Sequence, residues 1–514
     1  MYTAVNNIQF DSVEESDSMR RFMTAILTIA LTVVEGTSIA QSEWPEDRIS
    51  EEYVGRMPPN YRKVVFSEDG CHIAFVLDQG NRQVVEANGV AGRVYDEIGN
   101  IVFSPDGRHL AYVGVNGDKW EVVVDGKPGP AYDGISKSTP IFSPDSRHIA
   151  YVARNGNEAI VVVDGQPGLQ YDGIAKGNPK FSADGKRMAY AAKQGEKWIV
   201  VVDGQPSPRY DGINQESPVF SPDGKRVAYV AEHGNKWVLV MEGQKGREYD
   251  DAVSSPELSP DGARIACIAW NGPKARVVVD DQPGPEYDAI AAGTPIFSPD
   301  GKRWAYGAKT GSTWMVNVDG IAGPAYDSIG SNSMKFSQDG KHIACVAWKG
   351  NKGMVVLDGK QGLAYDEICE GPLFSPDGRH LAYAAHKGKK WVVVLDEQAG
   401  PEFDGIGIGS LIFSPDGTRT AYTAITGTQQ VAIVGGRSMP GFDGISDGSL
   451  TFSPNGRHVA YVVTKGTKDM VVVDGNPGPT YGMVMKNSPT FRDDGTMEYL
   501  AVMDGKIIRV RFLP

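Results

Sequence analysis

The sequence contains one pattern that could indicate a catalytic serine. Gly444 to Gly448 matches G-x-S-x-G, the motif around the nucleophile of α/β-hydrolases. That motif needs a strand, a sharp turn and a helix inside an α/β sheet. Here it lies between two repeated strand segments, where the equivalent positions read Gly134-Ile135-Ser136. We therefore interpret the match as chance and predict no catalytic residue.

The histidines and aspartates could suggest a metal site. Six of the eight histidines share one repeat position, which arginine occupies in other repeats, and a position that accepts arginine is not a ligand position. The aspartates occur once per turn and not in the clusters that calcium needs, so we expect them to bond their own backbone. We predict no metal and no cofactor. The histidines are His72, His109, His148, His342, His380 and His458, and the arginines are Arg187, Arg226, Arg264, Arg303 and Arg419.

Aromatic residues and cysteines also recur at fixed positions. Five tryptophans begin equivalent strand segments, where they could form a sugar-binding ladder or cover the core of each sheet. Cys267 and Cys345 replace a tyrosine of the repeat, so we expect small core residues with free thiols. The tryptophans are Trp120, Trp198, Trp237, Trp314 and Trp391.

These residues are positioned by a sequence repeat that occurs twelve times. The string Phe-Ser-Pro-Asp-Gly, with small variations, recurs every 37 to 39 residues to the C-terminus, and twelve such units leave no room for a separate catalytic domain. The first residues of the strings are Phe66, Phe103, Phe142, Phe181, Phe220, Leu258, Phe297, Phe336, Phe374, Phe413, Phe452 and Phe491.

Each unit is predicted to contain four short strands. In one unit we expect them at 140–142, 148–153, 159–163 and 171–174, separated by turn signals, which indicates an antiparallel meander. The third strand is apolar at consecutive positions, so both of its faces should be buried. A β-propeller, in which four-stranded blades pack side by side around an axis, satisfies this pattern, and a parallel β-solenoid is the alternative.

Three charged residues interrupt the apolar pattern of the innermost strand. Lys180, Glu257 and Lys335 stand directly before the first residue of the string, where most units have Val, Ile or Leu. A buried charge is costly unless it is paired, so these residues either pair across blades, meet solvent or contact a ligand at a central channel. The variable links 136–139, 214–217 and 331–333 should share one face with the turns between second and third strands, a surface suited to binding.

The ends of the repeat region indicate how the ring closes. The last unit has three strands, and Glu52 to Gly55 can supply the fourth. Propellers typically have four to eight blades, so twelve units favour two tandem six-bladed rings, with halves at 41–283 and 284–514 and a second closing strand at Tyr287. One larger ring is the alternative.

The first forty residues are interpreted as an addressing segment. Residues 19–40 have a basic start, an apolar run and a small-residue cleavage site, which is typical of a secretory signal peptide. Residues 1–40 would then be an extension plus signal peptide, with Met19 as the expected start. We expect a periplasmic or secreted protein without a membrane span in the mature chain. A net charge of −13 argues against nucleic acid as a partner.

The repeat resembles a known family. The segment Phe220 to Tyr229 and the longer form Val122 to Ile135 are similar to the TolB-type, WD-like propeller repeats of exported bacterial proteins, in an uncharacterised subfamily. The resemblance covers about residues 50 to 514 and implies a β-propeller. TolB has an additional α/β domain, and prolyl oligopeptidases have a hydrolase domain, for which these residues show no counterpart. Their functions are therefore not carried over.

These observations favour a binding protein. We expect a non-enzymatic, exported scaffold that binds another envelope or extracellular protein, or a polysaccharide. The alternative is a propeller enzyme, a glycan lyase, hydrolase or peptidase-like protein, that acts at a central channel.

Overall fold

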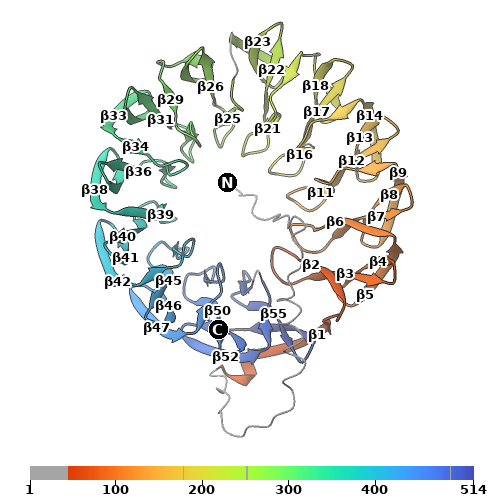
Figure 1. The fold of residues 1–514 in the computed structure, drawn as a ribbon, viewed down its shortest axis with the longest axis vertical. Coiled ribbons are helices and arrows are strands. Elements are labelled where there is room, and N and C mark those ends of the chain that lie inside the picture. Colours follow the sequence, from red (N-terminus) through yellow and green to blue (C-terminus); the bar gives the residue numbers. More distant parts are fainter. Residues whose placement is uncertain (1–43, 178, 250–252, 487) are drawn as a thin grey trace. The chain divides into compact units, whose positions relative to one another are not determined.

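The chain folds into twelve antiparallel sheets, the blades, which follow one another around one ring (Figure 1). The computed structural model describes residues 44–177, 179–249, 253–486 and 488–514, so the predicted signal peptide at 19–40 lies outside the described residues. Within these ranges a 3-10 helix at Glu46–Arg48 is the only helix, and none is long and apolar enough to cross a membrane. The all-β propeller prediction is confirmed.

Blade 3 illustrates the unit. Its strands are β10 (Gly134–Ile135), β11 (Ile141–Phe142), β12 (Ile149–Asn155), β13 (Glu158–Val163) and β14 (Gln166–Tyr171). Both β10 and β11 pair with β12, so they are two segments of one interrupted inner strand. Strand β14 forms the outer edge of the sheet.

The predicted fourth strand was misplaced. It spans Gln166–Tyr171, whereas Gly173–Ile174 (β15) is the first segment of the next blade. The preceding turn has only two residues, because Asp164 and Gly165 both have positive φ angles of 50° and 76°. Prolines in this strand had suggested a longer turn, but an outer-edge strand tolerates them and they block pairing with other chains.

The Ser-Pro-Asp-Gly string, which in blade 3 ends in Ser146 instead of Gly, forms a hydrogen-bonded turn. The hydroxyl of Ser143, which is fully buried, donates a hydrogen bond of 2.6 Å to Oδ1 of Asp145. The same carboxylate oxygen accepts the backbone N–H of Arg147 at 3.2 Å, and Ser143 Oγ accepts that of His148 at 2.9 Å. The predicted bonding of these aspartates to their own backbone is confirmed.

The third strand is buried on both faces, as predicted. Val161 and Val162 are 2% and 0% exposed. Val162 packs in a cluster with Ala111 of blade 2, and Val161 packs in a different cluster with Tyr190 of blade 4. Because successive strand residues point to opposite faces, each blade is held between its two neighbours. The solenoid alternative is wrong, since the sheets are arranged around a ring (Figure 1).

The two ends of the repeat region meet in blade 12, which confirms the predicted closure. Strand β1 (Ile49–Arg56) pairs antiparallel with β56 (Lys506–Phe512), and Ile49 lies opposite Phe512. The hydroxyl of Tyr481 in blade 11 donates a hydrogen bond of 2.7 Å to Glu51, which joins the closing strand to the neighbouring blade. The other strands of blade 12 are β53 (Met483–Val484), β54 (Thr490–Phe491) and β55 (Met497–Met503).

The structure contains the single larger ring in place of two tandem six-bladed rings. The strand at Tyr287, expected to close a second ring, stays in its own blade, where Tyr287 bridges Ala275. A hydrophobic cluster joins Val277 of blade 6 to Tyr306 of blade 7, so the packing continues across the midpoint. Another cluster joins blade 12 to blade 1. The division into halves 41–283 and 284–514 stays a prediction.

The remaining blades away from the sites described below repeat this plan. Blade 1 has β2 (Tyr61–Phe66), β3 (Ile73–Gln79), β4 (Arg82–Ala87) and β5 (Val90–Tyr95); blade 2 has β6 (Glu97–Phe103), β7 (Leu110–Asn116), β8 (Lys119–Val124) and β9 (Lys127–Tyr132); blade 9 has β39 (Glu367–Phe374), β40 (Leu381–Lys387), β41 (Lys390–Leu395) and β42 (Gln398–Phe403); blade 10 has β43 (Gly405–Ile406), β44 (Ile412–Phe413), β45 (Thr420–Thr426), β46 (Gln429–Val434) and β47 (Arg437–Phe442); blade 11 has β48 (Gly444–Ile445), β49 (Thr451–Phe452), β50 (Val459–Lys465), β51 (Lys468–Val473) and β52 (Asn476–Tyr481).

Candidate functional site

A pocket lies along the inner strands of blades 4, 5 and 6, and we call it the inner-edge pocket. Blade 4 consists of β15, β16 (Lys180–Phe181), β17 (Met188–Gln194), β18 (Lys197–Val202) and β19 (Gln205–Pro206); blade 5 of β20 (Gly212–Ile213), β21 (Val219–Phe220), β22 (Val227–His233), β23 (Lys236–Met241) and β24 (Gln244–Tyr249); blade 6 of β25 (Glu257–Leu258), β26 (Ile265–Asn271), β27 (Lys274–Val279) and β28 (Gln282–Pro283).

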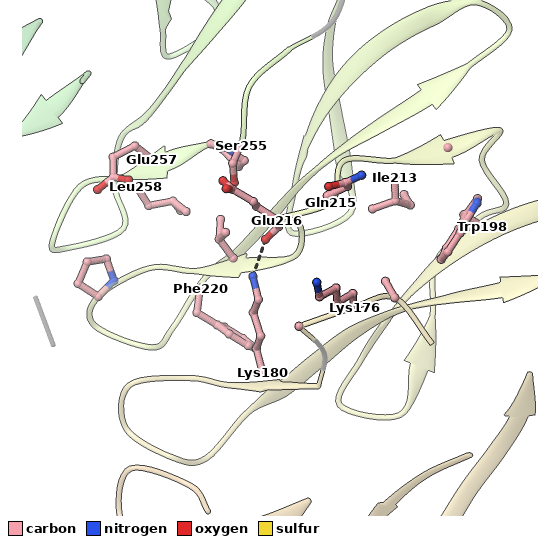
Figure 2. Close-up of a pocket in the computed structure, with 16 residues that line it drawn as sticks. Lys176, Lys180, Trp198, Ile213, Gln215, Glu216, Phe220, Ser255, Glu257 and Leu258 are labelled. Carbon is pink, nitrogen blue, oxygen red and sulfur yellow. Dashed lines mark hydrogen bonds between the residues drawn. The ribbon is translucent and has the colours of Figure 1, made fainter. Parts of the chain in front are cut away.

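The inner-edge pocket has a volume of about 1000 Å³ and a mixed lining. Figure 2 shows Lys180 and Glu257 on separate blades, with the segment of blade 5 that contains Glu216 between them. Lys180, Val219 and Glu257 hold the same repeat position on three consecutive inner strands, which explains why residues far apart in sequence line one pocket. Two of the three predicted ligand-binding residues are thus brought together.

Lys180 is half-buried on β16. Its Nζ atom donates a hydrogen bond to the backbone carbonyl oxygen of Glu216 in the next blade (Figure 2). Burial lowers the pKa of the Lys180 amine, and the nearby carboxylate of Glu216 opposes this by a smaller amount. This amine therefore both connects two blades and presents positive charge to the pocket.

Glu257 is the acidic counterpart on β25. Its side chain is exposed to solvent, and none of the ion pairs formed between described residues includes it. Partial desolvation in the concave wall raises the pKa of its carboxyl group even though water still reaches the side chain. The carboxylate is therefore available to a ligand.

Lys335 lies apart from these two residues. It is the first residue of β35 (Lys335–Phe336) in blade 8, and its side chain is exposed. It is not one of the residues that line the inner-edge pocket. The structure therefore does not join it to Lys180 and Glu257 in one site.

The link 214–217 of blade 5 is fixed to both neighbouring blades. The side-chain amide of Asn214 donates a hydrogen bond of 3.1 Å to the carbonyl of Val253 in blade 6, and its Oδ1 accepts the backbone N–H of Glu216 at 3.1 Å. Ser217 Oγ accepts the N–H of Val230 at 3.0 Å, which attaches the link to its own blade. The carbonyl of Glu216 that binds Lys180 is thus held in place from two sides.

We had expected the links to share a face with the turns between second and third strands, but they do not. They leave each inner strand between its two segments, so they lie along the inner edge of the sheets; in blade 3, Ile135 pairs with Ala153 and Ile141 with Ala150. The inner-edge location still leaves links of this kind in the pocket wall, where Lys176 and Gln215 occur (Figure 2).

Aromatic side chains complete the pocket lining. Trp198 and Phe220, both half-buried, contribute to opposite parts of the wall (Figure 2). Three of the five tryptophans cover blade cores: Trp120, Trp237 and Trp391 pack against separate hydrophobic clusters. Trp198 is the one of the five that lines the pocket, and sequence reasoning did not distinguish it from the others.

The other residues that could have formed a catalytic or metal site have structural roles. His148 Nδ1 lies 2.7 Å from Asp164 Oδ2, and Arg187 Nε donates to Asp203 Oδ2 at 2.9 Å, so His and Arg serve the same hairpin contact. Within the described ranges, no group of three or more His, Cys, Asp or Glu side chains could hold a metal ion. Ser446 follows β48 and is bonded through its N–H to the carbonyl of Val462 at 2.9 Å, and no helix follows it in the described chain. The four cysteines are free thiols, which confirms the prediction for Cys267 and Cys345.

Comparisons with solved structures find several similar chains, one of which is described as a β-propeller domain. A eukaryotic initiation factor structure is 13% identical, with 60% of this chain and 88% of that chain covered and a TM-score of 0.34. TolB from Acinetobacter baumannii is 17% identical, with 50% and 77% covered and a TM-score of 0.23. The β-propeller domain of the Trilobed protease from Pyrococcus furiosus is 12% identical, with 59% and 94% covered and a TM-score of 0.25. No family model and no curated protein matches the sequence.

Proposed function

We propose that this protein is an exported β-propeller scaffold that binds another envelope or extracellular protein, or a polysaccharide, through the inner-edge pocket. The observation that supports this most is the position of Lys180 and Glu257 on the wall of one pocket that also contains Trp198 and Phe220. Aromatic surface combined with a few charged groups is typical of binding sites in proteins. The signal-peptide pattern of residues 19–40 supports the proposed export.

The pocket is suited to an extended ligand. Its lining is spread over three blades, and the blade 5 link between Lys180 and Glu257 divides it (Figure 2). A chain of sugar or peptide units can meet an amine, a carboxylate and an aromatic surface in succession. Because Lys180 Nζ already binds the carbonyl of Glu216, the side chain is ordered before the ligand binds. Binding therefore costs less side-chain conformational entropy.

The experiment compares variants of the mature chain, residues 41–514, in two assays. Immobilised protein is incubated with a panel of labelled oligosaccharides and, separately, with cross-linked envelope extract. We expect K180A and E257Q each to weaken retention of the same partner by about tenfold, the loss of one charged contact. K137A, on the exposed link of blade 3, is the matched control and should retain the partner.

K335A measures how far the ligand extends. If the partner also contacts blade 8, this variant weakens retention; if the ligand is confined to the inner-edge pocket, it does not. Full retention by both K180A and E257Q would contradict the proposed site.

A second candidate function is enzymatic. Burial lowers the pKa of the Lys180 amine while partial desolvation raises the pKa of the Glu257 carboxyl in the same pocket. Opposed shifts of this kind accompany acid and base roles in active sites. The enzyme would be a glycan lyase, hydrolase or peptidase-like protein, and it would show turnover that is lost in both K180A and E257Q.

A further inference from the structure

Two blade interfaces lack an aromatic side chain that the others have. The third residue of the second strand is Tyr in nine blades and Phe75 in blade 1, but it is Cys267 in blade 6 and Cys345 in blade 8. The tyrosines are Tyr112, Tyr151, Tyr190, Tyr229, Tyr306, Tyr383, Tyr422, Tyr461 and Tyr499.

This tyrosine fills a defined space between blades. Its ring packs edge-to-face on an aromatic residue of the preceding blade's outer strand: the centroids of Tyr287 and Tyr306 are 5.9 Å apart. Its hydroxyl reaches a glycine of that same strand, since a Cβ atom on Gly284 would lie 3.8 Å from Tyr306 Oη. The side chain therefore occupies the space between the outer-strand tyrosine and this glycine.

At the interface of blades 7 and 8 that space is larger than at the next interface, where Tyr383 is present and lines an equivalent pocket of about 350 Å³ between blades 8 and 9. Blade 7 consists of β29 (Ala289–Ile290), β30 (Ile296–Phe297), β31 (Trp304–Thr310), β32 (Thr313–Val318) and β33 (Ile321–Tyr326), and blade 8 of β34 (Ser328–Ile329), β35, β36 (Ile343–Lys349), β37 (Lys352–Leu357) and β38 (Lys360–Tyr365). A pocket of about 430 Å³ lies there, lined by Cys345, Tyr326, Gly323, Pro324 and Gly359 among others. We call it the blade 7/8 pocket.

The walls of the blade 7/8 pocket are buried at its base and accessible at its mouth. Tyr326 is 2% exposed, and its hydroxyl makes no hydrogen bond of acceptable geometry to a described residue. Burial raises the pKa of this hydroxyl, with a smaller opposing effect from Gln361. Ile321, on the outer strand at the mouth, is 75% exposed. Burial also raises the pKa of the Cys345 thiol to about 12. The thiol therefore stays protonated and forms a weakly polar part of the pocket wall.

Blade 6 shows how the same loss is compensated elsewhere. There the carboxylate of Asp281 enters the space near Gly246, where Oδ1 accepts the backbone N–H of Arg247 at 3.0 Å and the hydroxyl of Tyr249 at 3.4 Å. The residue equivalent to Asp281 in blade 8 is Gly359, which has no side chain to fill the gap. The substitution at Cys345 is therefore left uncompensated by the chain.

We infer that the blade 7/8 pocket binds a phenol ring, which takes the place of the absent tyrosine. The ring would pack edge-to-face on Tyr326 as Tyr306 does on Tyr287, against the small side chain of Cys345. Its hydroxyl would lie toward Gly323, as the tyrosine hydroxyl lies toward Gly284 one interface earlier. The phenol can belong to a free small molecule or to a tyrosine side chain, since the chemistry is the same.

The experiment measures binding of 4-methylphenol to the full chain by calorimetry and ligand-observed NMR. We expect a Kd on the order of 1 mM, appropriate to a ligand of this size. In C345Y the protein's own ring should fill the space, so 4-methylphenol binding should fall by at least tenfold while Tm rises. C267Y is the matched control: it should retain 4-methylphenol binding, and its Tm should fall because Asp281 and Tyr249 already occupy that interface.

A second variant keeps the test decisive if C345Y does not fold. G359D places a carboxylate where blade 6 has Asp281, and it should weaken 4-methylphenol binding at least fivefold. N-acetyl-tyrosine amide, used beside 4-methylphenol, distinguishes the source: binding of both points to a tyrosine side chain, and binding of 4-methylphenol alone points to a free phenol. The inference is overturned if the wild-type chain binds neither probe, or if folded C345Y and G359D bind 4-methylphenol as tightly as wild type.

Discussion

Val161 and Val162 are adjacent in the chain yet are buried in different hydrophobic clusters, one shared with blade 4 and the other with blade 2. We predict that V161A and V162A each lower the free energy of unfolding by about 1 to 3 kcal/mol, because each removes methyl groups from a closed interface. Q166A, at an exposed outer-strand position, should change it by less than about 0.5 kcal/mol. Urea unfolding measures all three, and a neutral effect of either valine variant would show that one face of the strand is not packed.

The closure of blade 12 by β1 predicts that this strand can be supplied separately. A chain that begins after Arg56 should lose thermal stability, because the edge of β56 is then unpaired. A synthetic peptide of residues 44–57 should restore the Tm. A peptide with prolines at both 51 and 52 should not, since neighbouring N–H groups alternate in direction and one proline must remove a ladder bond. Equal rescue by both peptides would contradict the pairing.

The repeated turns predict a loss of stability in acid. Hydrogen bonds from the serine hydroxyl and a backbone N–H hold the pKa of Asp184, Asp300 and Asp339 below the ordinary value of 3.8. A carboxyl group with a lowered pKa stabilises the fold above its unfolded pKa, and this contribution is lost as pH falls below about 4. Urea midpoints measured from pH 7 to pH 2 should therefore decrease most steeply below pH 4.

Blade 11 provides the control for that acid dependence. Its turn carries Asn455, whose Oδ1 accepts the hydroxyl of Ser453 at 2.8 Å, so an amide serves the same turn without titrating. A variant with Asp184, Asp300 and Asp339 changed to Asn should fold and should show a shallower decrease below pH 4. An unchanged pH profile would mean that these turns do not determine the acid sensitivity.

The link 214–217 predicts a local effect on the inner-edge pocket. In N214A the hydrogen bond to the carbonyl of Val253 is lost, which is equivalent to about 1 kcal/mol of local stability. Amide hydrogen exchange of residues 214–219 should then be about fivefold faster, while the Tm changes little. Exchange that is unchanged in the link, or faster over all of blades 5 and 6, would contradict this description.

The sequence was informative wherever a feature repeats. Twelve copies of one string specified the blades, the two-sided burial of Val161 and Val162, and the turn at Ser143 and Asp145, because each copy obeys the same local rules. The missing strand of the last unit was equally visible, so the pairing of β1 with β56 could be predicted. The fourth strand was misplaced because Pro167 was taken as part of a turn, although an outer-edge strand accepts proline.

The features that depend on how blades meet were harder to predict. The number of blades in the ring depends on small angles between neighbouring sheets, and each interface has nearly the same sequence whether the ring is small or large. Lys180 and Glu257 stood out because they break the pattern, but the contributions of Asn214, Glu216 and Trp198 require knowing that consecutive inner strands lie side by side. The blade 7/8 pocket combines Cys345 with Gly359, and only their contact across the fold shows that neither replaces the lost ring.

The most direct test of the architecture is the number of blades seen in one particle. Class averages from electron microscopy of the mature chain, viewed along the ring axis, should show one ring of twelve similar blades, with blade 12 following directly on blade 1. Particles made of two smaller rings of six blades, joined near residue 283, would contradict the single ring, and with it the packing of blade 6 on blade 7.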